Sequence, residues 1–584
     1  MSTVSGKAVD FPILRKVFQY VSPYRRIFWA TVTLTILLAL LGPVRPWLTQ
    51  LTLDKYIAGG DTGGLLTLTA LMIATLMVQS SLQFFHSYQT NLLGQLVIKD
   101  LRVKLFNHII RFKIPYFDRT PVGTPVTRTI SDMETIADIF SDGLIVIIGD
   151  ILQLVVIVTY MFYLDWKLTI ISLSTLPFLI IATRVFQHNI KKTFTDVRTQ
   201  VAALNVFVQE HLTGIKIVQI FNREAREMEK FREINKEHRI ANVKSVWYYS
   251  IFFPVVEILS AISIGLIVWW GAGEVIEGKA SFGTVVAFIM YINLLFRPIR
   301  ELADKFNTLQ MGMVSSERIF KVLEMPSGHQ EEGTFLKPET LKGKIEFKNV
   351  WFAYKDEDWV LKDVSFVALP GETLAFVGAT GAGKSTIINL INRFYEINKG
   401  TILIDDVNLS DYDVATLRKR IATVLQDVFL FSDTIEKNIT LGEPSITSEM
   451  VRNGAARVGA DQFINKLPGK FNYNPGERGA MLSMGQRQLI SFIRAYVFNP
   501  SVLILDEATS SIDSESEAMI TYATSVLTKG RTSIVIAHRL ATIQNASRII
   551  VMDHGKIAES GTHQELLSKK GLYHGLYEIQ YQNK

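Results

Sequence analysis

The sequence predicts two parts, an α-helical membrane domain followed by a soluble α/β domain. Mean hydropathy is +0.22 and 48% of residues are hydrophobic, yet 20% are charged, so the apolar excess must be concentrated in one region. Six apolar runs long enough to cross a bilayer occupy the first part of the chain. From about Pro326 the runs shorten and Gly, Asp and Lys return, which is typical of a linker and then a globular domain. At 584 residues, two or more domains are expected.

Charge and cysteine content limit the kinds of site and surface that the chain can have. The net charge of +6 is small for this length, and the basic residues flank apolar runs, which indicates membrane flanks and not a nucleic-acid surface. The chain has no cysteine, so disulfides, thiolate metal sites and cysteine nucleophiles are excluded. The first 25 residues lack the apolar core of a cleaved signal peptide and are expected to form an amphipathic segment at the membrane surface.

Each apolar run has roughly the 20 residues that a transmembrane helix needs. The expected spans are Ile27–Leu48, Leu65–Phe85, Leu144–Tyr163, Leu168–Phe186, Ile251–Trp270 and Phe282–Ile299. The links after the second and fourth spans are long and rich in Lys and Arg, which predicts that these links and both termini face the cytoplasm. The long links keep a helical apolar period, so the helices are expected to continue beyond the membrane. These lengths disfavour the alternative, buried helices of a large soluble protein.

Polar residues inside the spans are candidates for contact with a transported molecule. An interhelical hydrogen bond or a place near the headgroups is the ordinary explanation for any one of them. The candidates are Arg45, Gln79, Gln83, Asp150, Gln153, Glu257 and Asn293.

A glycine-rich loop in the soluble domain is a candidate phosphate-binding site. The segment ETLAFVGATGAGKSTIINLINRF reads as a strand, a loop and a helix, and its loop fits G-x-x-x-x-G-K-S from Gly378 to Ser385. Such glycines let backbone N–H groups surround a phosphate at the helix N-terminus. Lys384 would reach the β and γ phosphates and Ser385 would bind Mg²⁺. A flexible glycine turn is the alternative, which the flanking strand and helix disfavour.

Two carboxylates end a second hydrophobic strand, SVLILDEATSSID. Asp506 would supply an oxygen ligand to Mg²⁺, and Glu507 could act as general base on the attacking water. Adjacent acids after a strand can also cap the next helix, and the phosphate loop makes that reading less favoured. In SIVIAHRL another apolar strand delivers His538, which could contact the γ-phosphate.

These motifs together resemble the ABC exporter family, as a half-transporter with six spans and one nucleotide-binding domain. The resemblance covers essentially the whole chain: YFDRTPVGTPVTRTISDMETI and EHLTGIKIVQIFNREAREMEKF are similar to the two loops that couple exporter helices to the ATPase. The matching motifs of the soluble domain are Walker A at Gly378–Thr386, the Q-loop at Gln426, Walker B ending in Asp506 with Glu507 after it, the D-loop at Ser510–Asp513, the H-loop at His538, and Tyr354 as the aromatic that stacks on adenine.

The resemblance implies an ATP hydrolase with ATP and Mg²⁺ as ligands. The residues it implies for catalysis are Glu507, His538, Lys384 and Gln426, and those for Mg²⁺ are Ser385, Gln426 and Asp506. Those implied for nucleotide binding are Tyr354, Gly378, Thr380, Gly381, Gly383, Lys384, Ser385, Thr386, Gln426, Ser483, Gly485 and Gln486.

The stretch Leu482–Gln486 matches the family signature, usually L-S-G-G-Q, with Met484 in place of a glycine. In this family the signature contacts ATP held by the other subunit, so a second half-transporter is implied. Because Glu507 is retained while the signature is altered, we expect a heterodimer in preference to a homodimer; methionine is flexible enough that a homodimer stays open. Tyr473 stands near a position where related exporters usually carry a glutamate, which puts the usual contact with the coupling loops in doubt.

The expected domains are an amphipathic N-terminal elbow (1–25), a six-helix transmembrane domain with two long cytoplasmic coupling loops (26–325), a linker (326–343) and the nucleotide-binding domain (344–584). The resemblance implies ATP-driven export of amphipathic drugs or lipids across the cell (inner or plasma) membrane, with the nucleotide-binding domain and both termini cytoplasmic and no nucleic-acid partner. The alternatives are a homodimeric lipid flippase or drug exporter, an exporter-fold importer and an ATP-gated regulatory ABC protein.

Overall fold

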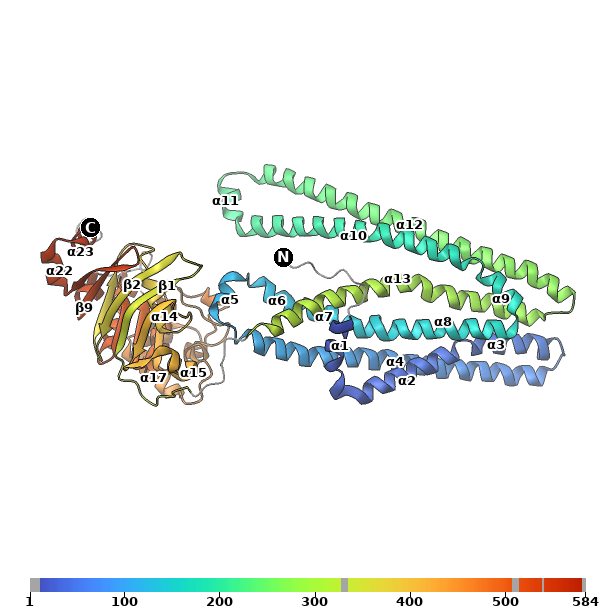
Figure 1. Ribbon diagram of the computed structural model, residues 1–584, viewed down its shortest axis with the longest axis horizontal. Helices are drawn as coiled ribbons and strands as arrows, with labels where there is room; N and C mark the ends of the chain where they lie inside the picture. Colours follow the sequence, from blue (N-terminus) through green and yellow to red (C-terminus); the bar gives the residue numbers. More distant parts are fainter. Residues whose placement is uncertain (1–10, 327–334, 507–513, 538–539, 580–584) are drawn as a thin grey trace. The chain divides into compact units, whose positions relative to one another are not determined.

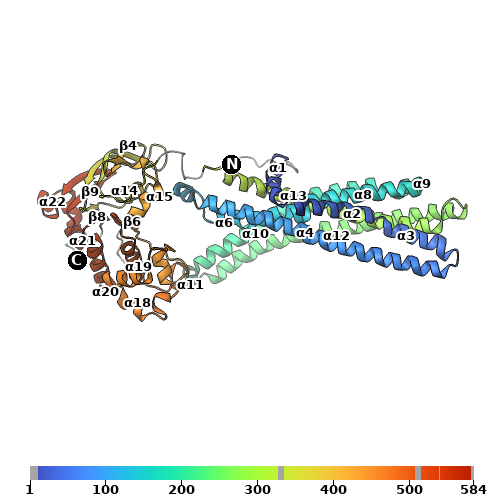
Figure 2. The same ribbon diagram turned by 90° about the horizontal axis from the view of Figure 1, so that it is seen from below.

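The computed structural model describes residues 11–326, 335–506, 514–537 and 540–579 (Figures 1 and 2). The chain forms two compact units. The first consists of Met1–Phe112 and Thr120–Ser327, and the second of Lys113–Arg119 and Gly328–Lys584.

The first unit is helical throughout its described residues. Its α-helices are α1 Phe11–Gln19, α2 Arg25–Leu41, α3 Val44–Leu51, α4 Thr62–Ile109, α6 Gly123–Thr129, α7 Ser131–Asp138, α8 Leu144–Leu164, α9 Trp166–Leu173, α10 Leu176–Thr213, α11 Ile215–Ile220, α12 Glu224–Ile276 and α13 Phe282–Glu324. Two π-helical turns, η2 Thr52–Ile57 and η3 Ile139–Gly143, follow α3 and precede α8.

Among the described residues, six helical segments are long and apolar enough to cross a membrane, which confirms the predicted number of spans. They are Ser22–Ile57, Thr62–Ile109, Gly123–Leu164, Trp166–Thr213, Glu224–Ile276 and Phe282–Glu324. Each is longer than the apolar run that predicted it. A helix of 53 residues, the length of α12, extends about 80 Å against about 30 Å of hydrocarbon. The prediction that helices continue beyond the bilayer is therefore confirmed.

Polar caps explain where three of the spans begin. Each of the three short links ends in a residue whose side chain accepts a hydrogen bond from a backbone N–H of the next helix. Asp61 accepts from Gly64 at 2.9 Å, Asp165 from Lys167 at 2.8 Å, and Ser281 from Thr284 at 3.1 Å. The short links therefore end where a capping side chain stands, and the apolar run starts directly after it.

Within the first unit, α10 and α12 run side by side and are joined by α11, while α13 packs against α3, α7 and α8 (Figures 1 and 2). Aromatic side chains hold the α10–α12 pair together. The rings of Phe186 and Phe252 stack with centroids 4.1 Å apart. Tyr291 of α13 is fully buried, and its hydroxyl donates to the backbone oxygen of Pro43 at 2.9 Å.

The second unit is built on two sheets. The four-stranded sheet has the order β2-β1-β4-β5 and the six-stranded sheet the order β10-β9-β3-β8-β7-β6. The strands are β1 Ile345–Ala353, β2 Trp359–Ala368, β3 Thr373–Val377, β4 Lys399–Ile404, β5 Val407–Asn408, β6 Ile421–Val424, β7 Val502–Asp506, β8 Thr532–Ile536, β9 Arg548–Asp553 and β10 Lys556–Gly561. In the larger sheet β9, β3, β8, β7 and β6 are parallel, and only β10 is antiparallel.

Eleven α-helices belong to this unit among its described residues. They are α5 Ile114–Arg119, α14 Lys384–Ile391, α15 Val414–Arg420, α16 Ile435–Thr440, α17 Ser448–Arg457, α18 Asp461–Lys466, α19 Met484–Val497, α20 Ser514–Thr528, α21 Leu540–Gln544, α22 His563–Lys569 and α23 Leu572–Tyr577.

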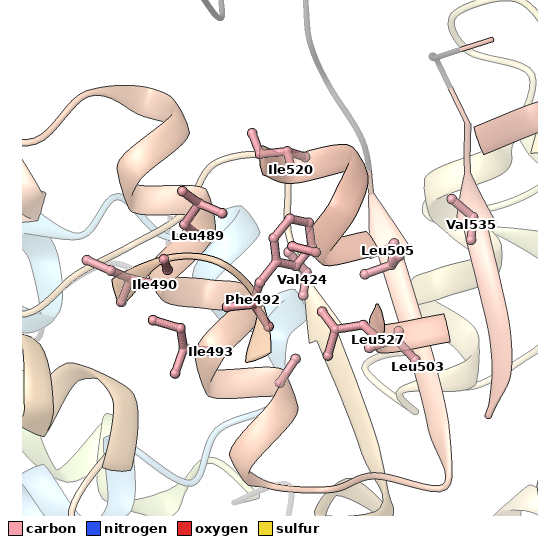
Figure 3. Packing of buried hydrophobic residues seen from close by; sticks show 14 of the residues in the cluster. Val424, Leu489, Ile490, Phe492, Ile493, Leu503, Leu505, Ile520, Leu527 and Val535 are labelled. Carbon is pink, nitrogen blue, oxygen red and sulfur yellow. The ribbon is translucent and has the colours of Figure 1, made fainter. Parts of the chain in front are cut away.

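The parallel strands are buried on both faces, so their sequences are continuously apolar. Successive residues of β7 alternate between two cores: Leu503 and Leu505 face one, and Val502 and Ile504 face the other. Figure 3 shows the first core, where Phe492 of α19 lies beside Val424 of β6. Because these strands are parallel, their carboxyl ends lie at one edge of the sheet, and the predicted site residues follow those ends in the sequence.

Candidate functional site

The glycine-rich loop between β3 and α14 has backbone geometry that only glycine supports at two positions. Gly378 has φ of 149°, and a Cβ there would lie 2.2 Å from the backbone oxygen of Met552. Gly383 has φ of 101° and immediately precedes α14, and a Cβ there would lie 2.7 Å from the Leu361 side chain. The loop is therefore held against β9 and β2, with the N-terminus of α14 at its end.

The side chain of Lys384 folds back onto the backbone of this loop. Its side chain is buried, and its Nζ donates to the backbone oxygens of Gly378 at 2.7 Å and Ala379 at 2.9 Å. Burial lowers the pKa of Lys384, while the negative charge of Asp506 opposes that shift. An ammonium group has three N–H donors, so the two loop carbonyls leave one for a phosphate.

Asp506 reaches the same edge of the sheet from β7. Ile536 of β8 stands in register with Phe376 of β3 on one side and with Asp506 on the other. Asp506 therefore lies two strands from the beginning of the glycine loop, a backbone separation of about 10 Å. Burial raises the pKa of Asp506, and Lys384 opposes that shift. The two predicted residues thus interact electrostatically, as a phosphate and metal site requires.

The oxygen donors predicted for the metal, Ser385, Gln426 and Asp506, are of the kind that Mg²⁺ prefers. Ser385, in the first turn of α14, and Gln426, just after β6, have exposed side chains, and Asp506 supplies one carboxylate. No cluster of three or more His, Cys, Asp or Glu residues that could hold a metal occurs within the described ranges. This donor set suits Mg²⁺, which commonly uses one or two carboxylates together with substrate phosphates, and it does not suit a metal that needs an all-protein cage.

Tyr354 follows β1 and is tied to the helix after the glycine loop. Its hydroxyl lies 3.2 Å from Oγ1 of Thr386 and accepts a hydrogen bond from Nδ2 of Asn389 at 3.3 Å. The Tyr395 ring packs edge-on against it, with centroids 5.0 Å apart. The Tyr354 side chain keeps 37% exposure. An aromatic ring is thus fixed beside the loop with part of its surface open to a base.

Residues 113–119, far away in sequence, belong to this unit and line an open cavity of about 910 Å³ that also reaches Tyr354. Arg119 donates to the backbone oxygen of Tyr354 at 3.3 Å, and Asp118 accepts a hydrogen bond from the Tyr395 hydroxyl. Sequence reasoning assigned this segment to a coupling loop without naming these residues. The charged pair in YFDRT was the available signal.

The signature stretch forms the N-terminus of α19. Ser483 and Gln486 form a reciprocal capping box: Ser483 Oγ accepts from the Gln486 N–H at 3.2 Å, and Gln486 Oε1 accepts from the Ser483 N–H at 3.1 Å. The side chain of Met484, the first helical residue, is 41% exposed. Sequence reasoning missed this box, although S-x-x-Q before an apolar run is its pattern. The hydroxyl hydrogen of Ser483 stays available to an anion.

The remaining predicted residues divide into two groups. Thr380 and Gly381 lie in the exposed part of the glycine loop, and Gly485 is buried in the first turn of α19. Glu507, His538 and the predicted D-loop Ser510–Asp513 lie outside the described residues. The strands that precede them, β7 and β8, end at the edge where Lys384 and Asp506 stand.

Two family sequence models match the chain, one in each half. The ABC transporter transmembrane region matches residues 28–299, and the ABC transporter model matches residues 361–510.

Relatives match over nearly the full length. The uncharacterized ABC transporter ATP-binding protein YknV of Bacillus subtilis is 38% identical over 577 residues, which cover 98% of this chain and 96% of the relative. The putative multidrug export ATP-binding/permease protein YgaD of the same organism is 34% identical, with 97% of this chain and 99% of the relative covered. The ATP-dependent lipid A-core flippase of Desulfotalea psychrophila is 35% identical, with the same coverage of 97% and 99%.

Proposed function

Because this chain belongs to the ABC transporter family, as a half-transporter that joins one six-span membrane region to one ATP-binding domain, we propose that it exports amphipathic drugs or lipids as one half of a dimer. The chain is a multi-pass membrane protein whose ATP hydrolysis is coupled to transport. Export and the class of substrate are supported by the relatives named for multidrug export and for lipid A-core flipping.

The observation that carries the proposal is the convergence of Lys384 and Asp506 at one sheet edge, in a chain that also has six spans. Lys384, already bound to two loop carbonyls, has one further N–H, which would bind the β and γ phosphates. The N–H groups at the start of α14 bind phosphate oxygens, and the Tyr354 ring stacks on adenine. ATP is thus held at its base and at its phosphates by elements that the structure ties together.

Hydrolysis requires a base and a stabilised phosphoryl group. Mg²⁺, held by Ser385, Gln426 and Asp506, would neutralise charge on the phosphates. Glu507, next to Asp506 in the sequence, orients the attacking water, and His538, two residues after the end of β8 in the sequence, contacts the γ-phosphate. Lys384 stabilises the charge that develops on the transferring group.

The signature of α19 serves the ATP of the other subunit in this proposal. The exposed N-terminus of α19 offers N–H groups and the Ser483 hydroxyl to a γ-phosphate. Met484 places a flexible side chain where that phosphate would approach, while Glu507 is retained. We therefore propose a heterodimer in which the competent site combines the Walker motifs of this chain with the signature of its partner; a homodimer is the alternative.

Orientation follows from the charge pattern of the links. The long links carry the Lys and Arg residues, and the helices continue into them as α4, α10 and α12. By the positive-inside tendency, the ATP-binding domain and both termini lie in the cytoplasm. ATP is available there, which agrees with this placement.

The experiment that tests the proposal is Mg²⁺-ATP hydrolysis by this chain alone in lipid nanodiscs, with Glu507→Gln as the blank. For a heterodimer, turnover should not exceed the blank until a second half-transporter is added. Robust turnover that Glu507→Gln abolishes would establish a working homodimer. Turnover that survives Glu507→Gln would remove the general base that the proposal assigns. Movement of a fluorescent lipid or drug into proteoliposomes, with the ATP-binding domains outside, then tests export itself.

A further inference from the structure

Helix α13 is more enclosed by its own chain than the other spans are. Of its most apolar stretch, 56% is buried inside the chain, against 28% or less in each of the other five spans. Tyr291, Ile292 and Leu295 are among its fully or almost fully buried residues. Little of α13 is therefore left to face lipid.

Apart from Phe282 at its start and Phe306 near its middle, the exposed residues that the structure describes in α13 are polar. Asn293 and Arg297 are exposed, and Arg300 and Glu301, one turn further on, are partly exposed. Spans that leave more surface open expose apolar side chains; α4, for example, exposes Leu76, Met77 and Phe84. Charged side chains at membrane depth face a water-filled cavity or headgroups, because contact with hydrocarbon is costly. We call Asn293, Arg297, Arg300 and Glu301 the α13 stripe.

The stripe continues through a chain of ion pairs to one buried pair, Lys305 with Asp150. Arg297 Nε lies 3.3 Å from Glu301 Oε1, and Lys305 Nζ lies 3.1 Å from the other oxygen of Glu301. Lys305 also bonds Asp150 of α8 at 2.7 Å, and their side chains are only 16% and 15% exposed. The buried end fixes α13 against α8, while Arg297, with 74% of its side chain exposed, stays accessible.

A second pair joins the stripe to α12. Arg300 Nη1 lies 3.5 Å from Oε1 of Glu257, whose side chain is 73% exposed. From Phe282 to Arg300, α13 rises about 27 Å, and from Ile276 back to Glu257, α12 rises about 28 Å. Both residues therefore stand close to one boundary of a hydrocarbon layer of about 30 Å, on the side away from the α12–α13 link. Headgroups of that leaflet lie at this depth.

The charges in these pairs balance. Three are positive (Arg297, Arg300 and Lys305) and three are negative (Asp150, Glu257 and Glu301). A purely anionic ligand at the arginines would displace the carboxylates that pair with them and leave those carboxylates unpaired. A purely cationic ligand at the carboxylates would lie beside the positively charged arginines. A headgroup that carries both charges can pair its phosphate with arginine and its ammonium with glutamate, so that none of these four side chains is left without an opposite charge.

We propose that the α13 stripe, together with Glu257, binds the headgroup of a zwitterionic phospholipid that enters from the adjacent leaflet. The phosphate is bound by Arg297 and Arg300, and the ammonium by Glu257 and Glu301. This names the substrate class of the export activity proposed above and rests on that proposal.

Lipid selectivity tests the site directly. The full-length chain is placed in nanodiscs of an uncharged galactolipid, and native mass spectrometry measures competition among phosphatidylethanolamine, anionic phosphatidylglycerol and a cationic dialkylammonium lipid. The wild type should retain phosphatidylethanolamine about tenfold better than either competitor, the factor expected from one charge-assisted hydrogen bond. Equal retention of all three lipids would overturn the proposal.

Two matched variants shift the preference in opposite directions. Glu257→Gln leaves Arg300 unpaired and should turn the preference toward phosphatidylglycerol, whereas Arg300→Gln leaves Glu257 unpaired and should turn it toward the cationic lipid. Lys279→Gln, which removes an exposed ion pair with Glu277 in the α12–α13 link, serves as the control and should leave the preference unchanged. Misfolding cannot produce two opposite gains of binding. No shift, or the same shift in both variants, would overturn the site.

Two further measurements distinguish a failure of the lipid site from a failure of the proposed export function. Competition by water-soluble glycerophosphoethanolamine as strong as that by the lipid would show that the ligand comes from water, contrary to the proposal. ATP-dependent flipping of a labelled phosphatidylethanolamine is measured in parallel. Selective binding without flipping would contradict export while leaving the lipid site intact. If the wild type shows no lipid selectivity, and if flipping or drug export is unaffected by Arg297→Gln, the export proposal would stand and the lipid site would be contradicted.

Discussion

The Tyr354 hydroxyl lies 3.2 Å from Oγ1 of Thr386, so the aromatic residue after β1 is bonded to the helix that follows the glycine loop. Asn389, one turn further along α14, donates to the same hydroxyl at 3.3 Å. The ring is thereby positioned by α14, the element that we propose binds phosphate. A change in the loop would move the ring as well, which connects the base and phosphate ends of the nucleotide.

Replacing Tyr354 should separate stacking from positioning. Tyr354→Ala removes the ring and should raise the KM for ATP about tenfold, since aromatic stacking on a base is worth about 1–3 kcal/mol. Tyr354→Phe keeps the ring but loses the bonds to Thr386 and Asn389, so its KM should rise only about threefold. The measurement is ATPase activity against ATP concentration in nanodiscs. Equal effects of the two variants would mean that the hydroxyl, and not the ring, is what ATP binding needs.

The glycine loop allows a paired test of a steric clash at one glycine against backbone strain alone at another. At Gly378 a Cβ would meet the Met552 backbone oxygen at 2.2 Å, and β9 cannot move away, so Gly378→Ala should destabilise the ATP-binding domain by about 3 kcal/mol or more. Gly381 has φ of 86° but nothing within 4 Å, so Gly381→Ala should cost only about 1–2 kcal/mol of backbone strain. Thermal unfolding in detergent distinguishes them. A melting temperature lowered equally in both variants would contradict the clash at Gly378.

Hydrolysis should depend on Mg²⁺, and Asp506 should set the Mg²⁺ concentration that it requires. The carboxylate is partly buried and electrostatically coupled to Lys384, so Asp506→Asn removes the proposed metal ligand together with the charge that opposes the lowered pKa of that lysine. We expect EDTA to abolish hydrolysis by the wild type, and Asp506→Asn to raise the Mg²⁺ concentration for half-maximal activity at least about tenfold. Titration of Mg²⁺ at saturating ATP is the measurement. An unchanged midpoint in Asp506→Asn would exclude Asp506 as a ligand.

The parts of the fold that sequence predicts well are those governed by local pattern. Six long apolar runs led to six spans, and a strand, a glycine loop and a helix appeared at the expected positions as β3 and α14. The first span was predicted as one run from Ile27 to Leu48, but α2 ends at Leu41 and α3 begins at Val44, because Pro43 interrupts the backbone ladder between them. Hydropathy alone does not distinguish a broken helix from a continuous one.

Contacts between distant segments were beyond sequence reasoning. Asp150, Glu257 and Asn293 were recognised as polar residues inside spans, but their neighbours depend on how each helix rotates, and apolar spans provide little periodicity to fix that rotation. Lys305, which pairs with Asp150 across 155 positions, lies beyond the predicted end of the sixth span and was not considered. The bond from Arg119 to the backbone of Tyr354 likewise depends on the tertiary fold alone.

The junction between η2 and α13 has no room for a side chain at Gly283. Its N–H donates to Oδ1 of Asp54 at 2.7 Å, and a Cβ would lie 2.6 Å from that oxygen and 2.6 Å from the backbone oxygen of Gln50. Gly283→Ala should therefore destabilise the membrane domain by about 1–3 kcal/mol. Gly273→Ala, in α12 with nothing within 4 Å, is the matched control and should be neutral or slightly stabilising. Thermal unfolding of both variants in nanodiscs checks this, and equal melting temperatures would contradict the close approach.

The signature methionine gives the sharpest test of subunit pairing. Met484 is the first residue of α19 and 41% exposed, and in the proposed dimer its side chain would lie where the γ-phosphate of a partner's ATP approaches. If this crowding prevents a homodimer from hydrolysing ATP, Met484→Gly should raise the turnover of the chain alone about tenfold above the Glu507→Gln blank, equivalent to about 1.4 kcal/mol. Met484→Ala, which keeps a Cβ and favours the helix, should give a smaller rise. In the heterodimer Met484→Gly should leave the competent site nearly unchanged, because that site uses the signature of the partner. A wild-type chain that is already as active alone as Met484→Gly would show that methionine is tolerated and that two copies of this chain suffice.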